Sequence, residues 1–146
     1  MKDILISAAH DDSREAVVEL LKNERLPVDD LPTHLDDFIL ATGDSQVIAA
    51  VGLERYGAYG LLRSLVVRPD YRNQHIAGKL IDQLESNAAA SGLKEIYLLT
   101  ETAPDYFDRK GYMKISRVQV PDVLMQSSEF SHTCPKSAIV MKKTLK

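Results

Sequence analysis

The 146-residue sequence contains a single cysteine, Cys134, and no tryptophan. One thiol excludes both an internal disulfide and a multi-cysteine zinc site. We expect Cys134 to be a small buried apolar residue, because a nucleophilic cysteine would need a base beside it. No segment approaches 18 consecutive apolar residues, and Met1–Ala9 is too short and too charged for a signal peptide. These absences predict a soluble, cytoplasmic protein that does not bind a membrane.

A strong excess of charge is also absent, since the formal net charge is only -3. Such a chain has no basic surface for nucleic acid, so any anionic ligand must be held locally. His10, His34 and His132 match no metal-ligand spacing, and we expect no metal site. Hydrophobic residues make up 45% and charged residues 27%, as in ordinary globular proteins. Residues 1–146 are therefore expected to form one domain that needs no metal or disulfide to fold.

Hydrophobic periodicity predicts alternating strands and helices. Strands are expected at Lys2–Ala8, Asp37–Thr42, Gln46–Arg55, Tyr59–Arg68, Glu95–Thr100, Tyr112–Val120 and Ala138–Leu145. Helices are expected after Asp12, from Ile76 to Ala88, from Thr102 to near Gly111, and inside Pro121–Pro135. Asp12 with Glu15, and Thr102 with Asp105, have the spacing of a capping box.

Smaller features complete the expected layout. Gly43-Asp44-Ser45 suits a tight hairpin, whereas Leu26–Leu35 contains two prolines and is expected to be mostly loop. The element order predicts an α/β (α+β) fold with a mixed, mostly antiparallel sheet and helices on both faces. One parallel βαβ crossover should connect Val67 with Ile96.

The segment Leu61–Leu80 is expected to contain a strand, a turn and the start of the longest helix. A helix start presents unpaired N–H groups and the positive end of the helix dipole, which suit a diphosphate. In this segment Arg72-Asn73-Gln74-His75-Ile76-Ala77 resembles the coenzyme A loop, Gln/Arg-x-x-Gly-x-Gly/Ala, of the GNAT (GCN5-related) N-acetyltransferase family. The resemblance continues in Leu65–Pro69 and in Tyr106–Tyr112, which is similar to the family's aromatic-aromatic-x-x-x-Gly-aromatic signature.

This resemblance implies the GNAT fold, acetyl-CoA as co-substrate, and direct attack by an amine in a ternary complex. It implies that the backbone N–H near Val67 polarises the thioester carbonyl. It also implies a set of cofactor-binding residues: Leu65, Val66, Val67, Arg72, Asn73, Gln74, His75, Ile76, Ala77, Gly78, Lys79 and Phe107.

Two positions depart from the family pattern. His75 stands where the family usually has its first glycine, so either the position is simply helical, or the imidazole adds a contact to a phosphate. Phe107 stands where many members have the tyrosine that protonates the departing thiolate. Its neighbour Tyr106 either takes that role or packs the helix against the sheet, with water or the amine's own proton serving instead.

Residues that bind or deprotonate the acceptor amine are expected at strand ends. Glu54 and Glu101 are alternative bases for the amine, with Glu101 slightly favoured, and a solvated surface carboxylate is the alternative role for each. Thr100, beside Glu101, is also assigned to substrate binding. Arg63 is expected to share a face with Leu65 and Val67, either in a structural salt bridge or as a clamp on a substrate carboxylate.

Leu62–Val67, Tyr97–Thr102 and the segment around Cys134-Pro135 are similar to one branch of the family, the short N-acetyltransferases found with arsenic-resistance genes. This resemblance implies an amino acid or an oxyanionic amino-acid analogue as acceptor. The resemblance to the family suggests a homodimer, with the Pro121–Pro135 segment and the last strand as contacts. Two alternatives stay open, namely acetylation of a protein amine and a non-catalytic acyl-CoA sensor.

Overall fold

The computed structural model describes residues 4–26, 28, 31, 35, 37–72, 74–100, 103–125 and 138–145. The strands are β1 (Ile4–Ala8), β2 (Ile39–Gly43), β3 (Gln46–Tyr56), β4 (Tyr59–Val67), β5 (Glu95–Thr100), β6 (Met113–Ile115) and β7 (Ile139–Thr144). The α-helices are α1 (Arg14–Asn23), α2 (Ile76–Ala90), α3 (Pro104–Arg109) and α4 (Asp122–Met125). Three short 3-10 helices are η1 (Asp11–Ser13), η2 (Pro69–Tyr71) and η3 (Arg117–Gln119).

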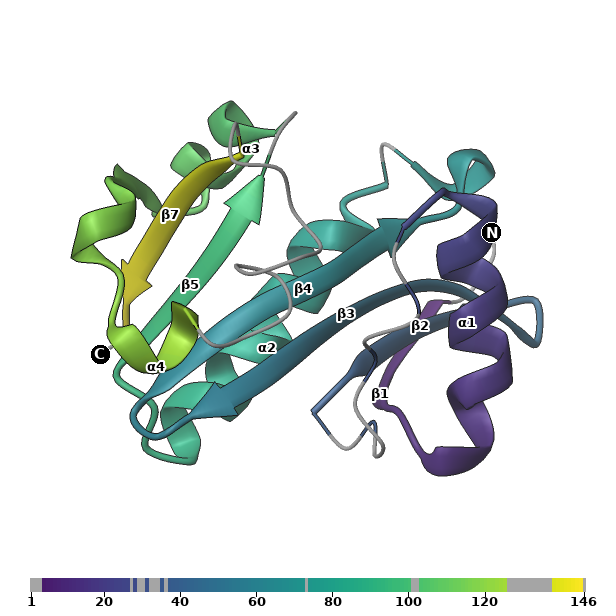
Figure 1. The fold of residues 1–146 in the computed structure, drawn as a ribbon. Helices are drawn as coiled ribbons and strands as arrows, with labels where there is room; N and C mark the ends of the chain where they lie inside the picture. The colour runs from purple at the N-terminus through teal and green to yellow at the C-terminus, as the bar shows by residue number, and fades with distance from the viewer. Residues whose placement is uncertain are drawn as a thin grey trace. The chain divides into compact units, whose positions relative to one another are not determined.

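The described strands form one sheet in the order β1-β2-β3-β4-β5-β7-β6 (Figure 1). β4 and β5 are parallel, with Tyr59 opposite Glu95 and Leu61 opposite Tyr97. The β1–β2, β2–β3, β5–β7 and β6–β7 pairs are antiparallel. The predicted mixed sheet with one parallel crossover is therefore confirmed.

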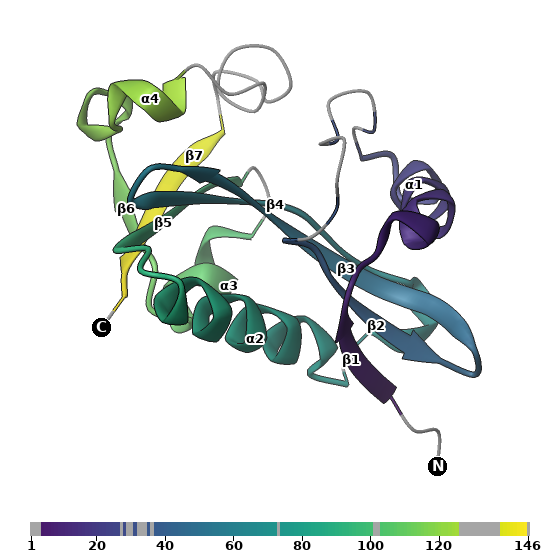
Figure 2. The same ribbon diagram turned by 90° about the horizontal axis from the view of Figure 1, so that it is seen from below.

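The chain divides into two compact units, which are described separately. The first unit comprises Met1–Leu53 with Ser64–Asn87, and the second comprises Glu54–Arg63 with Ala88–Lys146. In the first unit α1 and α2 cover opposite faces of the strands, and in the second α4 and α3 do so (Figure 2). Helices therefore lie on both faces of the sheet, as predicted.

The core of the first unit lies under α1. The helix buries Val17, Leu20 and Leu21 against a cluster that includes Leu40 and Val66. Burying each such side chain contributes about 1.5–3 kcal/mol relative to leaving it exposed. The apolar stripe expected for α2 consists of Ile76, Ala77, Leu80, Ile81, Leu84 and Ala88. Ala77 is half-buried, and the other five residues are buried.

A tight hairpin joins β2 to β3. Asp44 and Ser45 have φ angles of 52° and 66°, as both central residues of a type I′ turn require. Gly43 precedes them because a Cβ there would lie 2.9 Å from the Ile4 side chain and 3.3 Å from the Tyr71 ring. The predicted hairpin is confirmed, and Tyr71 is packed against it.

The second unit has a smaller core beneath α4. Leu124 and Val120 pack against Leu61, Tyr97 and Val140. In this unit the prediction of a strand over Tyr112–Val120 is wrong, because β6 ends at Ile115. Ser116 and Gln119 form a capping box at the start of η3. The apolar residues that follow lie in η3 and α4 and not in a strand.

Two helix starts also differ from the prediction. The N-cap of α1 is Ser13 and not Asp12, because η1 occupies Asp11–Ser13 first. The N-cap of α3 is Ala103, followed by Pro104 in the first helical position. Several predicted features lie outside the described residues, namely Cys134, His34, His132, Asn73, Glu101, Thr102, and most of 26–35 and 126–137.

Candidate active site

The candidate phosphate loop runs from the end of β4 through η2 to the start of α2, within the first unit. The loop is attached to the β2–β3 hairpin, since the Tyr71 hydroxyl donates to Asp44 Oδ2 at 3.0 Å. The Arg68 amide also donates to the Ile48 carbonyl at 2.8 Å. These bonds fix the backbone that leads into α2.

The start of α2 is suited to an anion. The first four N–H groups of a helix have no intrahelical acceptor, and here they belong to the segment His75–Gly78. The first turn of α2 contains no acidic residue. Gln74 and His75 are exposed beside it, and Lys79 lies one turn further along. Unpaired N–H groups beside exposed polar side chains are what anion binding at a helix start requires. Asn73, also expected to bind the cofactor, lies outside the described residues.

His75 has φ of +62°, in the left-handed region. Its carbonyl nevertheless accepts the first α2 hydrogen bond, from the Lys79 amide at 3.2 Å. The interpretation that position 75 is simply helical is therefore wrong. Glycine adopts this conformation freely, whereas histidine adopts it at a cost in free energy. This difference explains why loops of this kind favour glycine at the position of His75.

The side chain of Arg72 is exposed but bound to other residues of the protein. Its Nη2 donates to Glu24 Oε1 at 2.5 Å, and its Nε donates to the Val67 carbonyl at 3.2 Å. The guanidinium thus connects the end of β4 to the C-terminus of α1. Sequence analysis missed Glu24, because no local pattern links residues 48 positions apart.

β4, which carries the expected cofactor-binding residues Leu65, Val66 and Val67, is irregular. Ser64 has φ of +59° in the middle of β4, which is the geometry of a bulge. Beyond it Val66 is buried under α1, while Leu65 and Val67 are half-buried. The left-handed Ser64 interrupts the two-residue alternation of the strand. The alternation from which we expected Arg63, Leu65 and Val67 to share one face of the sheet therefore does not continue past Ser64.

Arg63 and Glu54 form an ion pair in the second unit, with Arg63 Nη1 2.5 Å from Glu54 Oε2. The Arg63 side chain is fully buried and that of Glu54 is 16% exposed. The Tyr56 hydroxyl donates to the other oxygen, Glu54 Oε1, at 2.5 Å. Strand alternation from Glu54 would have found Tyr56, which sequence analysis missed.

The remaining candidates of the second unit lie around α3. Thr100 is buried, and its hydroxyl oxygen accepts the Ala103 amide at 3.1 Å. Phe107 is buried edge-to-face between Tyr106 and Tyr112, with ring centroids 5.4 and 5.7 Å away. Tyr106 is half-buried. The α3 aromatics thus form a packed group that holds the helix against Tyr112.

Within the described ranges, no group of three or more His, Cys, Asp or Glu side chains could hold a metal ion. Among the helices described above, none is long and apolar enough to cross a membrane.

The fold combines a mixed sheet with one parallel crossover, an irregular β4, and a helix α2 whose first turn holds no acidic residue. Residues 34–114 match the family model of the acetyltransferase (GNAT) domain. The chain therefore belongs to the GNAT acetyltransferase family, which confirms the resemblance of the sequence to that family. It is an acetyltransferase that uses acetyl-CoA as co-substrate.

Individual relatives of the chain also carry the names of acetyltransferases. An uncharacterized N-acetyltransferase of Chlorobaculum tepidum is 29% identical over 123 residues, which cover 81% of this chain and 77% of that protein. The amino-acid acetyltransferase of Pseudomonas fluorescens is 27% identical over 93 residues, or 62% of this chain, but these are only 22% of that longer enzyme.

Among solved structures, the N-acetylglutamate synthase of Neisseria gonorrhoeae, complexed with coenzyme A and N-acetyl-glutamate, superposes with a TM-score of 0.84. The match covers 99% of this chain and 35% of that one at 14% identity. At this identity the likeness shows the fold alone.

Proposed function

We propose that the chain acetylates the amine of a small carboxylate-bearing molecule, a free amino acid or an oxyanionic amino-acid analogue. The observation that carries the proposal is the Glu54 carboxylate, which is partly exposed and held by Arg63 and Tyr56. The similarity to amino-acid acetyltransferases supports the acceptor class.

Glu54 receives the amine in this proposal. Both of its oxygens already accept one hydrogen bond, so the carboxylate has a fixed direction, and each oxygen keeps a second lone pair for a substrate N–H. A fully buried guanidinium offers no face to a substrate, so Arg63 acts as a positioning residue for Glu54. This burial favours the structural ion pair over the carboxylate clamp.

The transfer then needs few further groups. A chain-terminal α-amine has a pKa near 8, and the carboxylate of a free amino acid raises the pKa of its amine further, so most of the substrate is protonated at pH 7 and one proton leaves to solvent before the attack. Its nitrogen attacks the thioester carbonyl, the C–N bond forms and the C–S bond breaks. The surplus ammonium proton passes to Glu54 directly or through water, and the thiolate takes a proton from Tyr106 or water. The N–H near Val67 stabilises the developing oxyanion.

Acetyl-CoA is held at the start of α2. The amides of His75–Gly78 bind the diphosphate, and the exposed Gln74, His75 and Lys79 side chains surround it. Arg72 contributes indirectly, because its guanidinium is already bound to Glu24 and the Val67 carbonyl. Arg72 therefore positions the loop. Acetyl-CoA supplies the activated acetyl group as its thioester.

The test is a mass-spectrometric screen of acetyl-CoA with the twenty amino acids, oxyanionic analogues and a set of peptides. We expect an N-acetylated product from at least one free amino acid or analogue and none from the peptides. Turnover on peptides alone would favour a protein acetyltransferase. Binding of acetyl-CoA without turnover of any amine would favour an acyl-CoA sensor.

Variants test the role of Glu54. Glu54→Gln should lower kcat by about 100-fold or more and leave the KM of acetyl-CoA nearly unchanged. Asp105→Asn, which removes an exposed carboxylate in the same unit, is the matched control and should leave both constants unchanged. Equal kinetics of the two variants would remove Glu54 from the mechanism.

A further inference from the structure

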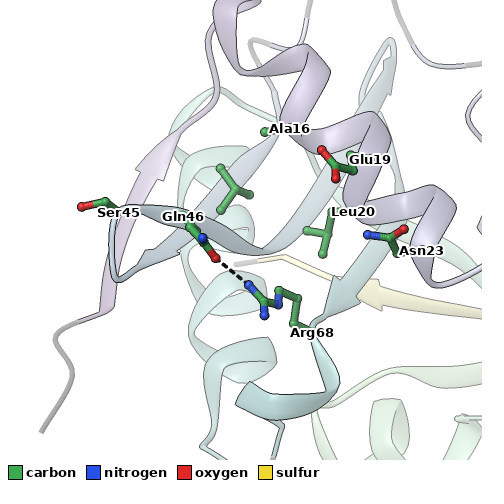
Figure 3. Close-up of a pocket in the computed structure, with 8 residues that line it drawn as sticks. Ala16, Glu19, Leu20, Asn23, Ser45, Gln46 and Arg68 are labelled. Atoms are coloured by element: carbon green, nitrogen blue, oxygen red, sulfur yellow. Dashed lines mark hydrogen bonds between the residues drawn. The ribbon is translucent and has the colours of Figure 1, made fainter.

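A pocket of about 570 Å³ lies within the first unit, between α1 and the β2–β3 hairpin (Figure 3). Leu20 and Val47 form its apolar base, and both belong to the cluster beneath α1. The volume is within the range of small-molecule sites. None of its lining residues belongs to the proposed acetyl-CoA or acceptor groups.

The α1 wall of the pocket provides acceptors. Glu19 and Asn23 lie four residues apart and therefore project from the same face of the helix (Figure 3). Neither side chain forms a hydrogen bond or ion pair with another residue of the described part of the chain. A carboxylate and an amide are thus available on this wall.

The opposite wall provides donors. Arg68 Nη1 donates to Gln46 Oε1 at 2.8 Å, and Nη2 donates to Asp70 Oδ2 at 3.0 Å. The guanidinium lies over the Tyr71 ring, 5.7 Å from its centroid. Two of the five guanidinium N–H groups are used in these bonds, and the Gln46 Nε2 donors are not consumed by them. The donors are therefore fixed in place and still able to bind a ligand.

We propose that this pocket binds a free α-amino acid as a zwitterion. The ammonium group meets Glu19, the carboxylate meets Arg68 and the Gln46 amide, and the side chain covers Leu20 and Val47. A ligand with only negative charge would face Glu19, and one with only positive charge would face Arg68. Opposite charges on facing walls above an apolar base select a molecule that carries both.

Occupation of the pocket acts on the phosphate loop. Arg68 directly follows Val67, the last residue of β4, and precedes η2, which leads into α2. A ligand held by Arg68 therefore changes the KM of acetyl-CoA and leaves kcat nearly constant. This consequence rests on the proposed function, whereas binding to the pocket does not.

Calorimetry without acetyl-CoA tests the binding. The probes are the twenty amino acids, each at up to about 10 mM, a range that detects weak complexes. For the tightest binder, Glu19→Gln and Arg68→Met should each weaken affinity by about tenfold or more. The N-acetyl derivative and the matching amino alcohol, which each lack one charge, should bind comparably weakly.

Glu15→Gln is the matched control, because Glu15 is an exposed carboxylate of α1 outside the pocket. It should leave the affinity unchanged. Glu19 and Arg68 are not core residues, and thermal unfolding of the unliganded variants verifies that they fold. The proposal is overturned if no amino acid binds, or if Glu19→Gln and Arg68→Met both bind like the wild type, which would place the amino acid elsewhere, at the acceptor site.

Discussion

Replacing His75 with glycine should stabilise the protein and weaken coenzyme A binding. At φ of +62° an L-residue is strained by about 1–2 kcal/mol, and glycine is not. Part of this gain is offset by the greater freedom of glycine in the unfolded chain, about 0.4–1 kcal/mol. We therefore expect a net stabilisation of about 0.5–1 kcal/mol, which raises Tm by roughly 2–4 °C for a domain of this size.

Thermal unfolding without ligand measures this effect. Lys79→Gly is the matched control, because Lys79 lies in the ordinary part of α2, where glycine costs about 1 kcal/mol. Loss of stability in both variants would refute the left-handed conformation of His75. His75→Ala keeps the strain and removes the imidazole, which separates the two effects.

Coenzyme A titrations at pH 6 and pH 8 test the imidazole itself. A protonated imidazole beside a phosphate is stabilised by the opposite charge, so wild-type affinity should rise as the pH falls from 8 to 6. His75→Gly and His75→Ala should both lose this pH dependence. If all three proteins keep the same pH dependence, the imidazole makes no phosphate contact.

The remaining predictions concern the loop, the aromatic group and the sheet. Arg72 positions the loop through Glu24. Glu24→Gln and Arg72→Gln should therefore both weaken coenzyme A binding by roughly threefold, as expected for a partly exposed ion pair. Tighter binding by the Glu24→Gln variant would instead indicate that Arg72 is a phosphate ligand. Tyr106→Phe should change kcat by less than about threefold, because water can protonate the thiolate, and a 100-fold loss would assign Tyr106 as the acid. The Lys142 ammonium, 2.9 Å away, lowers the pKa of Glu95 below its usual 4.5. This interaction therefore stabilises the fold fully above pH 4.5 and is lost as the pH falls through the lowered pKa. Lys142→Met should thus be less stable than the wild type at pH 7, with a difference that shrinks in acid titrations followed by circular dichroism.

Local patterns in the sequence predicted most elements. The stripe from Ile76 to Ala88 is a strong helical signal, and Glu95–Thr100 is a strand with the bounds predicted. The error over Tyr112–Val120 arose because apolar residues of a 3-10 helix and a short helix fit strand alternation equally well. Periodicity reports which residues are buried, but it does not report where one short element ends and the next begins.

The candidate site was predicted less completely. The loop motif placed His75 at a glycine position, and its left-handed backbone agrees with that placement. The engagement of Arg72 with Glu24 was not predictable, because it depends on tertiary packing of α1 near the loop. Arg63 was correctly expected to need a partner, since a buried guanidinium without one is too costly. Which carboxylate would pair with it was visible only in the fold.

The central claim is that the start of α2 holds the diphosphate of acetyl-CoA. Calorimetric titration of the wild-type protein with coenzyme A and with pantetheine, which lacks the diphosphate and the nucleotide, tests it most directly. Two or three charge-assisted hydrogen bonds predict that coenzyme A binds at least about 100-fold more tightly at low salt. Equal affinities, or no binding of coenzyme A at millimolar concentration, would contradict the account.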